Sequence, residues 1–190
     1  MEQAQKTALL VMDLQPFILQ RYSETSKLIE STNKAIDAAR KANIPVIFVI
    51  VGFREGFPEV SPNNKFFSGM KKNDVVGITQ NLHVDPSVHK QDGDVVVIKK
   101  RFGAFAGSDL EVILKGYQAE RLVLAGISTS GVVLSTVRYA ADKDYFLTVL
   151  SDCCTDKDDE VHRVLMEKVF PVQADVMTSE DWIKSISKSE

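Results

Sequence analysis

The chain has 190 residues, of which 44% are hydrophobic and 26% are charged, values typical of a globular protein. Its 23 basic and 26 acidic residues give a net charge of −3, which excludes the basic composition that most nucleic-acid-binding domains need. We therefore expect no nucleic-acid partner. At about 100–200 residues per domain, the length predicts a single domain over residues 1–190.

The apolar runs and the cysteines predict a cytoplasmic protein with no membrane partner. The first apolar run, 8–12, is too short for the core of a signal peptide or for a membrane span. The two cysteines, Cys153 and Cys154, are adjacent, and adjacent residues rarely satisfy the geometry of a disulfide. Free thiols are typical of a reducing compartment.

Short apolar runs predict the strands of a parallel sheet. They are rich in β-branched residues and do not alternate with polar ones, as expected for strands covered on both faces. The runs cover 8–12, 45–51, 95–98, 121–125, 145–150 and, more weakly, 172–176.

Between these runs, apolar residues recur at helical spacing. The predicted helices cover 24–43, 110–116, 131–142 and 158–169, and a last one begins near 178. Ser23 or Thr25 would cap the first helix, and Ser108 the second. This alternation predicts an α/β fold, a three-layer, doubly wound parallel sheet of about six strands with helices on both faces. Ligands then bind at the carboxyl ends of the strands.

The segment 52–93 interrupts the alternation, with several Pro and Gly and only weak periodicity. Long irregular excursions in compact domains are usually functional or disordered. Its four phenylalanines, at 53, 57, 66 and 67, predict that it packs as an ordered flap over the site.

Three strand ends offer chemically useful groups. Asp13 follows the first strand, where partial desolvation would raise its pKa and suit it to general acid or base work. Lys99 ends the third strand, so its cation could lie beside Asp13. The fourth strand leads into a turn of small residues that begins at Gly126, and its amides could hold an anion or a developing oxyanion. The amides of 130–132 would hold the anionic or carbonyl end of the substrate. A capping Asp, a solvated basic turn and a simple tight loop are the respective alternatives.

These segments, in this order, resemble the isochorismatase-like hydrolase superfamily, often called cysteine hydrolases. The resemblance rests on Asp-Leu-Gln at 13–15, Lys-Lys-Arg-Phe-Gly-Ala-Phe at 99–105 and the turn and helix at 126–136, and it covers nearly the whole chain. It implies a parallel sheet flanked by helices, assembly into dimers or tetramers, and a site made of an Asp, a Lys and a Cys. Carried over, Asp13 is the general acid/base and Lys99 its electrostatic partner.

The cysteine position departs from the family. Members read Gly-x-x-Thr-x-x-Cys-Val, and counting from Gly126 through Thr129 reaches Val132, which offers no nucleophile. The resemblance implies that the isochorismatase branch also lacks this Cys, its Asp protonating a vinyl ether before water attacks. We therefore expect a hydrolase that acts on a small molecule by Asp13 and Lys99 acid–base catalysis without a covalent cysteine.

The candidate substrate-binding residues lie within or beside these motifs. They are Gln15, Phe17, Arg54, Phe102, Thr129, Ser130 and Gly131. We expect no cofactor and no metal, because the segment 52–58 has no His where the nicotinamidase branch of the family binds its metal.

Three other interpretations remain open. The chain could be a non-catalytic member that binds a small molecule or a protein through the same pocket. It could be a hydrolase that uses Cys153 or Cys154, or one that pairs a hydroxyl of 128–130 with Lys99. We also expect a homodimer or homotetramer, because the helix 131–142 is apolar around much of its circumference.

Overall fold

The computed structural model describes residues 6–72, 77–80 and 82–187. Its centre is a parallel sheet of six strands in the order β3-β2-β1-β4-β5-β6. The strands are β1 (Thr7–Met12), β2 (Val46–Val51), β3 (Val95–Lys99), β4 (Arg121–Ile127), β5 (Phe146–Thr155) and β6 (Asp175–Met177). The chain winds outward from β1 to β3, then returns to β4 and winds the other way. The predicted doubly wound α/β fold is confirmed.

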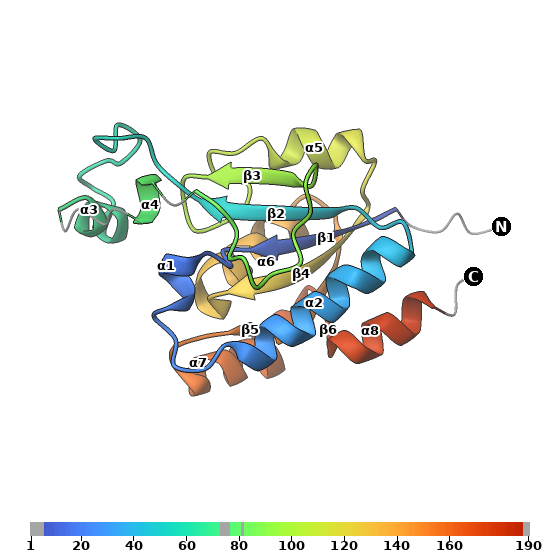
Figure 1. Ribbon diagram of the computed structural model, residues 1–190. Coiled ribbons are helices and arrows are strands. Elements are labelled where there is room, and N and C mark those ends of the chain that lie inside the picture. Colours follow the sequence, from blue (N-terminus) through green and yellow to red (C-terminus); the bar gives the residue numbers. More distant parts are fainter. Residues whose placement is uncertain (1–5, 73–76, 81, 188–190) are drawn as a thin grey trace.

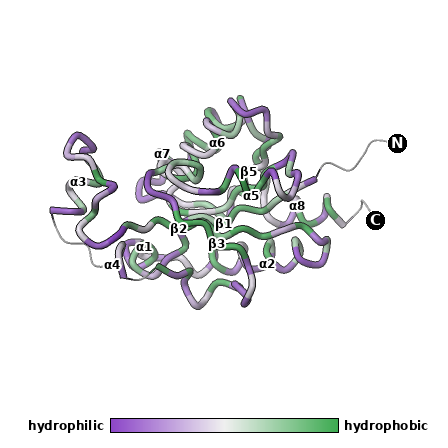
Figure 2. Tube along the Cα trace, turned by 90° about the horizontal axis from the view of Figure 1, so that it is seen from above, coloured by the Kyte–Doolittle hydropathy of each residue, from purple (hydrophilic) through white to green (hydrophobic). Residues whose placement is uncertain are grey.

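Helices cover both faces of the sheet, which accounts for the continuous apolar runs of β1, β2 and β4 (Figure 1). On one face lie α2 (Ser26–Lys41) and α8 (Ser179–Ile186), which pack Ile36 and Trp182 against the sheet. On the other face lie α5 (Leu110–Gly116), the π-helical η1 (Thr129–Val133), α6 (Leu134–Ala141), α7 (Asp159–Val164), the π-helical η2 (Leu165–Val169) and the 3₁₀ turn η3 (Phe170–Val172). In Figure 2 the apolar strands accordingly form the centre of the molecule.

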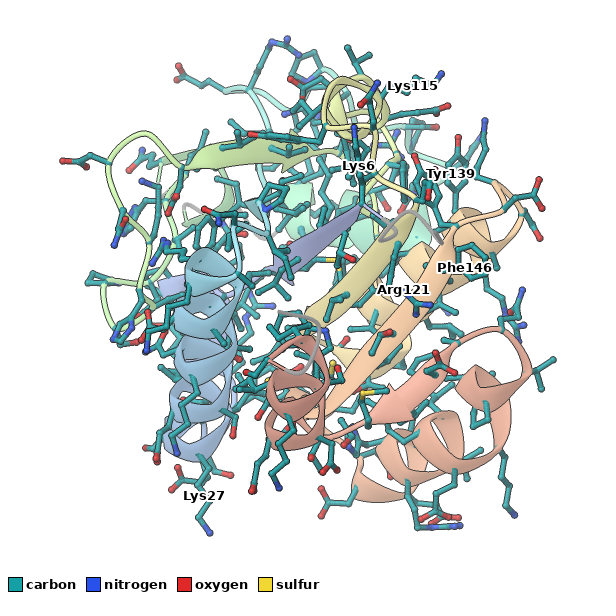
Figure 3. The ribbon with its side chains drawn as sticks, turned by 90° about the vertical axis from the view of Figure 1, so that its right-hand side faces the viewer. Lys6, Lys27, Lys115, Arg121, Tyr139 and Phe146 are labelled. Atoms are coloured by element: carbon teal, nitrogen blue, oxygen red, sulfur yellow. The ribbon has the colours of Figure 1, made fainter. Side chains whose placement is uncertain are left out.

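The remaining helices lie at the end of the sheet where the strands terminate (Figure 1). They are α1 (Pro16–Leu19), α3 (Lys65–Lys72) and α4 (Gly77–Gln80). The opposite end carries the strand starts, where Figure 3 labels Arg121 and Phe146, with the guanidinium 5.3 Å from the ring centre.

Most predicted elements are present, with shifted boundaries. The helix predicted over 131–142 instead begins at Thr129 as a π-helical turn, in which the Val133 amide donates to the Ser128 carbonyl at 3.3 Å. Ser108 lies outside α5, whose N-cap is Asp109. The weak strand predicted over 172–176 is only Asp175–Met177, because the preceding residues form η3.

The fifth strand is longer than the sequence predicts. The apolar run predicts a strand over 145–150. β5 instead continues to Thr155, after a register shift against β4. The Asp152 carboxylate stabilises this extension by accepting hydrogen bonds from the amide and the hydroxyl of Ser179, at 2.7 and 2.6 Å.

Candidate active site

A cavity of about 450 Å³ lies at the carboxyl ends of the strands. It sits beside the point where the strand order reverses between β1 and β4, the usual ligand position in a doubly wound sheet. The lining residues are Asp13, Phe17, Ile18, Arg21, Tyr22, Val51, Phe66, Phe67, Met70, Lys99, Phe102, Ile127, Ser128, Ser130, Gly131, Val132, Asp156 and Lys157.

Asp13 and Lys99 meet in the wall of this cavity, as predicted. Lys99 Nζ lies 2.9 Å from Asp13 Oδ2, and the two side chains are only 2% and 8% exposed. Their strands are not neighbours, because β2 lies between β1 and β3. Two strand spacings amount to about 10 Å, a gap that the long lysine side chain bridges. Lys99 Nζ also donates to the carbonyl of Arg101 at 2.9 Å, which fixes its position.

Burial gives the Asp13 carboxyl unusual properties. Desolvation raises the pKa of Asp13 above its ordinary value, and the neighbouring Lys99 cation opposes only part of that rise. Asp13 Oδ2 faces Lys99, whereas Oδ1 is buried without a hydrogen-bond partner among the described residues. A buried acceptor of this kind is costly unless a ligand, or a proton on the carboxyl, satisfies it. Asp13 is therefore suited to exchange a proton with a bound molecule.

The turn after β4 reaches the cavity because β1 and β4 approach closely there. Gly126 pairs with Met12, and a Cβ at Gly126 would overlap the Met12 carbonyl oxygen. Gly126 also has a φ of +155°, which side-chain-bearing residues rarely adopt. The next peptide bond, Ile127–Ser128, is cis. The chain then enters η1, which presents Ser130 and Val132 to the cavity.

The amides of this turn are not free to hold an anion as predicted. The Ser130 amide donates to Asp156 Oδ2 at 2.7 Å, and the Gly131 amide donates to the Ser128 carbonyl at 3.1 Å. Asp156 comes from the end of β5 and occupies the place that the sequence assigned to a ligand. The expectation that the amides of Ser130 to Val132 hold the anionic or carbonyl end of a substrate is therefore not met at Ser130 and Gly131, and it stays a prediction for Val132.

The other candidate substrate-binding residues divide into two groups. Phe17 and Phe102 line the cavity. Gln15 and Thr129 are fully buried behind it. Gln15 accepts from the Val51 amide at 2.8 Å and donates to the Val51 carbonyl at 3.2 Å, so it holds the ends of β1 and β2 together.

Thr129 and Arg54 likewise make contacts outside the cavity. Thr129 Oγ1 lies 2.8 Å from His162 Nδ1, so a histidine does meet a hydroxyl of this turn, although it is remote in sequence. The Arg54 side chain is 73% exposed and pairs with Glu59. The prediction that Arg54 reaches the substrate is not met, because the guanidinium points to solvent instead of into the cavity.

An aromatic wall from the predicted flap closes one side of the cavity. The rings of Phe66 and Phe67 in α3 lie 4.8 and 5.3 Å from the ring of Phe102, between centres. Phe67 also packs on Phe53 at 5.3 Å, and both are buried. The four-phenylalanine pattern indicated this packing, but it could not show which rings face the cavity.

Sequence reasoning missed four lining residues with polar or charged side chains, of which Lys157 directly follows Asp156. Tyr22 and Arg21 follow α1, and Asp156 follows β5. Burial and the nearby Asp156 carboxylate raise the pKa of the Tyr22 hydroxyl, while a hydrogen bond with Ser128 lowers it. These residues lie outside any motif, so only the folded chain reveals them.

Comparison with known proteins places the chain in a family. A family model described as the isochorismatase domain matches residues 7–181. The chain belongs to the isochorismatase family. The uncharacterized isochorismatase family protein YecD of Escherichia coli O157:H7 is 30% identical over 187 residues, which cover 96% of this chain and 97% of that protein. The ureidoacrylate amidohydrolase RutB of Serratia proteamaculans is 30% identical over 171 residues, 78% of this chain and 69% of the enzyme.

A solved structure extends the match to three dimensions. An isochorismatase family protein from Burkholderia thailandensis superposes with a TM-score of 0.81 at 26% identity, and the match covers 96% of each chain. The family's fold is therefore present over almost the full length.

The two thiols of this isochorismatase family member lie away from the cavity. Cys153 packs in the core beneath α2 and α8, and Cys154 in the core on the opposite face. The apolar run 145–150 would place both cysteines after the fifth strand, but they lie within β5. Burial raises the pKa of both thiols, that of Cys154 to about 12. Neither is among the lining residues, whereas Val132 is.

Within the described residues, no three His, Cys, Asp or Glu side chains cluster as metal ligands would. None of the helices in that part of the chain is long and apolar enough to cross a membrane.

Proposed function

We propose that this chain is a small-molecule hydrolase in which Asp13 is the general acid–base and Lys99 its electrostatic partner, without a covalent cysteine intermediate. One observation carries the proposal. A buried ion pair lines the cavity, and one carboxylate oxygen of that pair, Asp13 Oδ1, has no partner among the described residues. Residues 1–190 then form one catalytic domain.

The raised pKa of Asp13 supports its role as a proton donor. The carboxyl gives its proton to the substrate, and water adds to the carbon that becomes electron-poor. The proton that the water loses returns to Asp13, so the net reaction is hydrolysis and the enzyme is restored. Lys99 stabilises the carboxylate between these two transfers, at 2.9 Å.

Val132 is the reason for excluding covalent catalysis. Its side chain lines the cavity at the position where the sequence motif places the family's cysteine, and it cannot form an acyl intermediate. Cys153 and Cys154 are buried on either face of the sheet, with raised thiol pKa values. Thiolates are the reactive form of cysteine, so neither suits a nucleophile.

The cavity and the relatives support a small organic substrate. The aromatic wall of Phe66, Phe67 and Phe102 suits a flat or apolar group. RutB is an amidohydrolase of ureidoacrylate, so amides and ureido compounds belong in the first substrate panel, beside vinyl ethers and esters.

The other expectations, of a cytoplasmic homodimer or homotetramer with no nucleic-acid or membrane partner, stay predictions. The apolar pattern of helix 131–142 does not by itself require a second subunit. Val133, Val137 and Ala140 are buried within the chain, against the sheet.

A second function, binding without catalysis, is favoured by the same valine. Without a side-chain nucleophile, the cavity could retain a ligand and leave it unchanged. Turnover by the purified protein decides between the two functions.

The test measures hydrolysis of an amide, a ureido compound, an ester and a vinyl ether by the wild type and by Asp13→Asn. We expect turnover of at least one, and a loss of about 10²–10⁴-fold in Asp13→Asn, the usual contribution of a general acid–base group. Asp92→Asn is the matched control, because Asp92 is exposed and does not line the cavity. Full activity of Asp13→Asn would refute the mechanism, and no turnover of any compound would favour the binding function.

A further inference from the structure

Asp156 is a carboxylate in the cavity wall that the proposed chemistry does not use. It follows β5 and is half-buried beside the turn that enters η1. Its Oδ2 accepts the Ser130 amide at 2.7 Å, and its Oδ1 accepts the Lys157 amide at 2.8 Å. Two backbone donors therefore fix the carboxylate in one orientation.

An ionised carboxylate offers about four acceptor positions, and these two amides use only two of them. Arg21 and Lys157 also line the cavity, but among the described residues neither side chain forms an ion pair with Asp156 within 4.0 Å. Asp156 therefore presents unneutralised negative charge and free acceptor capacity to whatever enters the cavity.

A second acceptor in the same cavity wall also favours a ligand that donates hydrogen bonds. Asp13 Oδ1 is buried and has no hydrogen-bond partner among the described residues. A ligand that donates hydrogen bonds would satisfy both acceptors. A ligand carboxylate would instead be repelled by Asp156 and could not donate to Asp13 Oδ1, although Lys99 offsets the charge of Asp13.

We propose that Asp156 is a specificity-determining residue. Its carboxylate accepts the hydrogen bond of the Ser130 amide, so this amide cannot donate to a ligand. A bound molecule must therefore present a hydrogen-bond donor to the carboxylate at this wall. Molecules with a primary amide, a ureido group or a hydroxyl group there are accepted, and carboxylates are excluded. The inference deepens the proposed function, since it names the chemistry of the substrate's polar end. Its test measures binding and needs no turnover.

Benzamide and benzoate are suitable probes, because they share the same ring. The amide group of benzamide donates hydrogen bonds and is neutral, whereas the carboxylate of benzoate only accepts hydrogen bonds and is negatively charged. Their dissociation constants are measured by ligand-observed NMR titration at neutral pH. We expect wild type to bind benzamide at least about tenfold more tightly than benzoate, as expected when like charges are brought together. Failure to bind benzamide, or equal binding of the two, would overturn the proposal.

Asp156→Ala is the decisive variant, because it frees the Ser130 and Lys157 amides. Its affinity for benzoate should rise by about tenfold or more, while benzamide binding weakens. Asp156→Asn removes the charge but keeps an acceptor, so it should shift the ratio in the same direction by less. Asp159→Asn, an equal charge change at an exposed residue that does not line the cavity, should leave the ratio unchanged.

Loss of structure is checked by thermal unfolding with and without sodium formate. Formate can replace the missing carboxylate, so it should raise the Tm of Asp156→Ala more than that of wild type, with sodium chloride as the salt control. An unchanged benzoate-to-benzamide ratio in a folded Asp156→Ala or Asp156→Asn protein would refute the role of Asp156. That result would leave the hydrolysis test with Asp13→Asn unaffected.

Discussion

Replacing Lys99 by Met tests whether the buried ion pair is charged as the geometry indicates. At 2.9 Å and an effective dielectric constant of about 20, the two charges attract by about 6 kcal/mol, most of which offsets their desolvation. Lys99→Met fills a similar volume but leaves Asp13 as an unpaired buried carboxylate. Breaking such a pair typically costs about 3–5 kcal/mol of unfolding free energy. We expect that loss near neutral pH.

The loss should depend on pH in a defined direction. Burial raises the pKa of Asp13 in the folded chain, so the folded state binds this proton more tightly than the unfolded state. The contribution of this group to stability therefore falls as pH rises from its unfolded pKa, about 3.9, through its folded pKa. Without the Lys99 cation the folded pKa rises further and the fall is larger. The deficit of Lys99→Met should accordingly shrink as pH drops toward about 4.

Urea denaturation of wild type and Lys99→Met at several pH values measures this difference. The matched control is Lys115→Met, because the Lys115 side chain is 73% exposed and pairs with Glu111 only at the surface. Exposed pairs contribute about 0–1 kcal/mol, so the control should change little at any pH. A Lys99→Met deficit below about 1 kcal/mol, or one that grows at low pH, would refute the charged, buried pair.

Three further outcomes follow from the same contacts. Cys153 and Cys154 should resist alkylation in the native protein and react fully in urea, because burial keeps both in the thiol form. Mass spectrometry measures the labelling, and rapid labelling of the native protein would contradict their burial. Val132→Cys should create a thiol at the cavity that the same reagent labels faster than either native cysteine, because it lies in the first turn of the helical segment that begins at Thr129. Gly126→Ala should lower the free energy of unfolding by about 1–3 kcal/mol or more in urea, since its Cβ would overlap Met12.

The fold was predictable because the four central strands, β1, β2, β4 and the first half of β5, coincide with continuous apolar runs. β2 is buried at all six positions and β4 at all but the first, so no alternation masked them. The order of the strands in the sheet cannot be predicted from these runs, because it depends on which helices cover which face. The sequence placed Asp13 and Lys99 at one sheet edge but could not show that β2 separates them.

The polar residues of the site were predictable only where a motif contains them. Asp13 directly follows β1 and Lys99 ends β3, so their positions are fixed by the apolar runs before them. Asp156 follows a stretch in which Ser151 and Asp152 hide the continuation of β5, so nothing in the sequence placed its carboxylate against the Ser130 amide. Arg54 illustrates the converse. A surface ion pair is the usual fate of such a cation, and it pairs with Glu59, but the sequence does not show which carboxylate it meets.

The apolar residues of the flap shield the buried ion pair of Asp13 and Lys99 from water. Phe53, Phe57 and Phe67 pack with Val51 in an apolar cluster at the edge where the strands end. Val51 and Phe67 line the same cavity as Asp13, so this cluster covers an edge that solvent would otherwise reach. Burial is the largest cause of the raised pKa of Asp13, and an apolar wall maintains it. The excursion that interrupts the strand–helix alternation thus supplies the low-dielectric surroundings in which a carboxyl can hold a proton for catalysis.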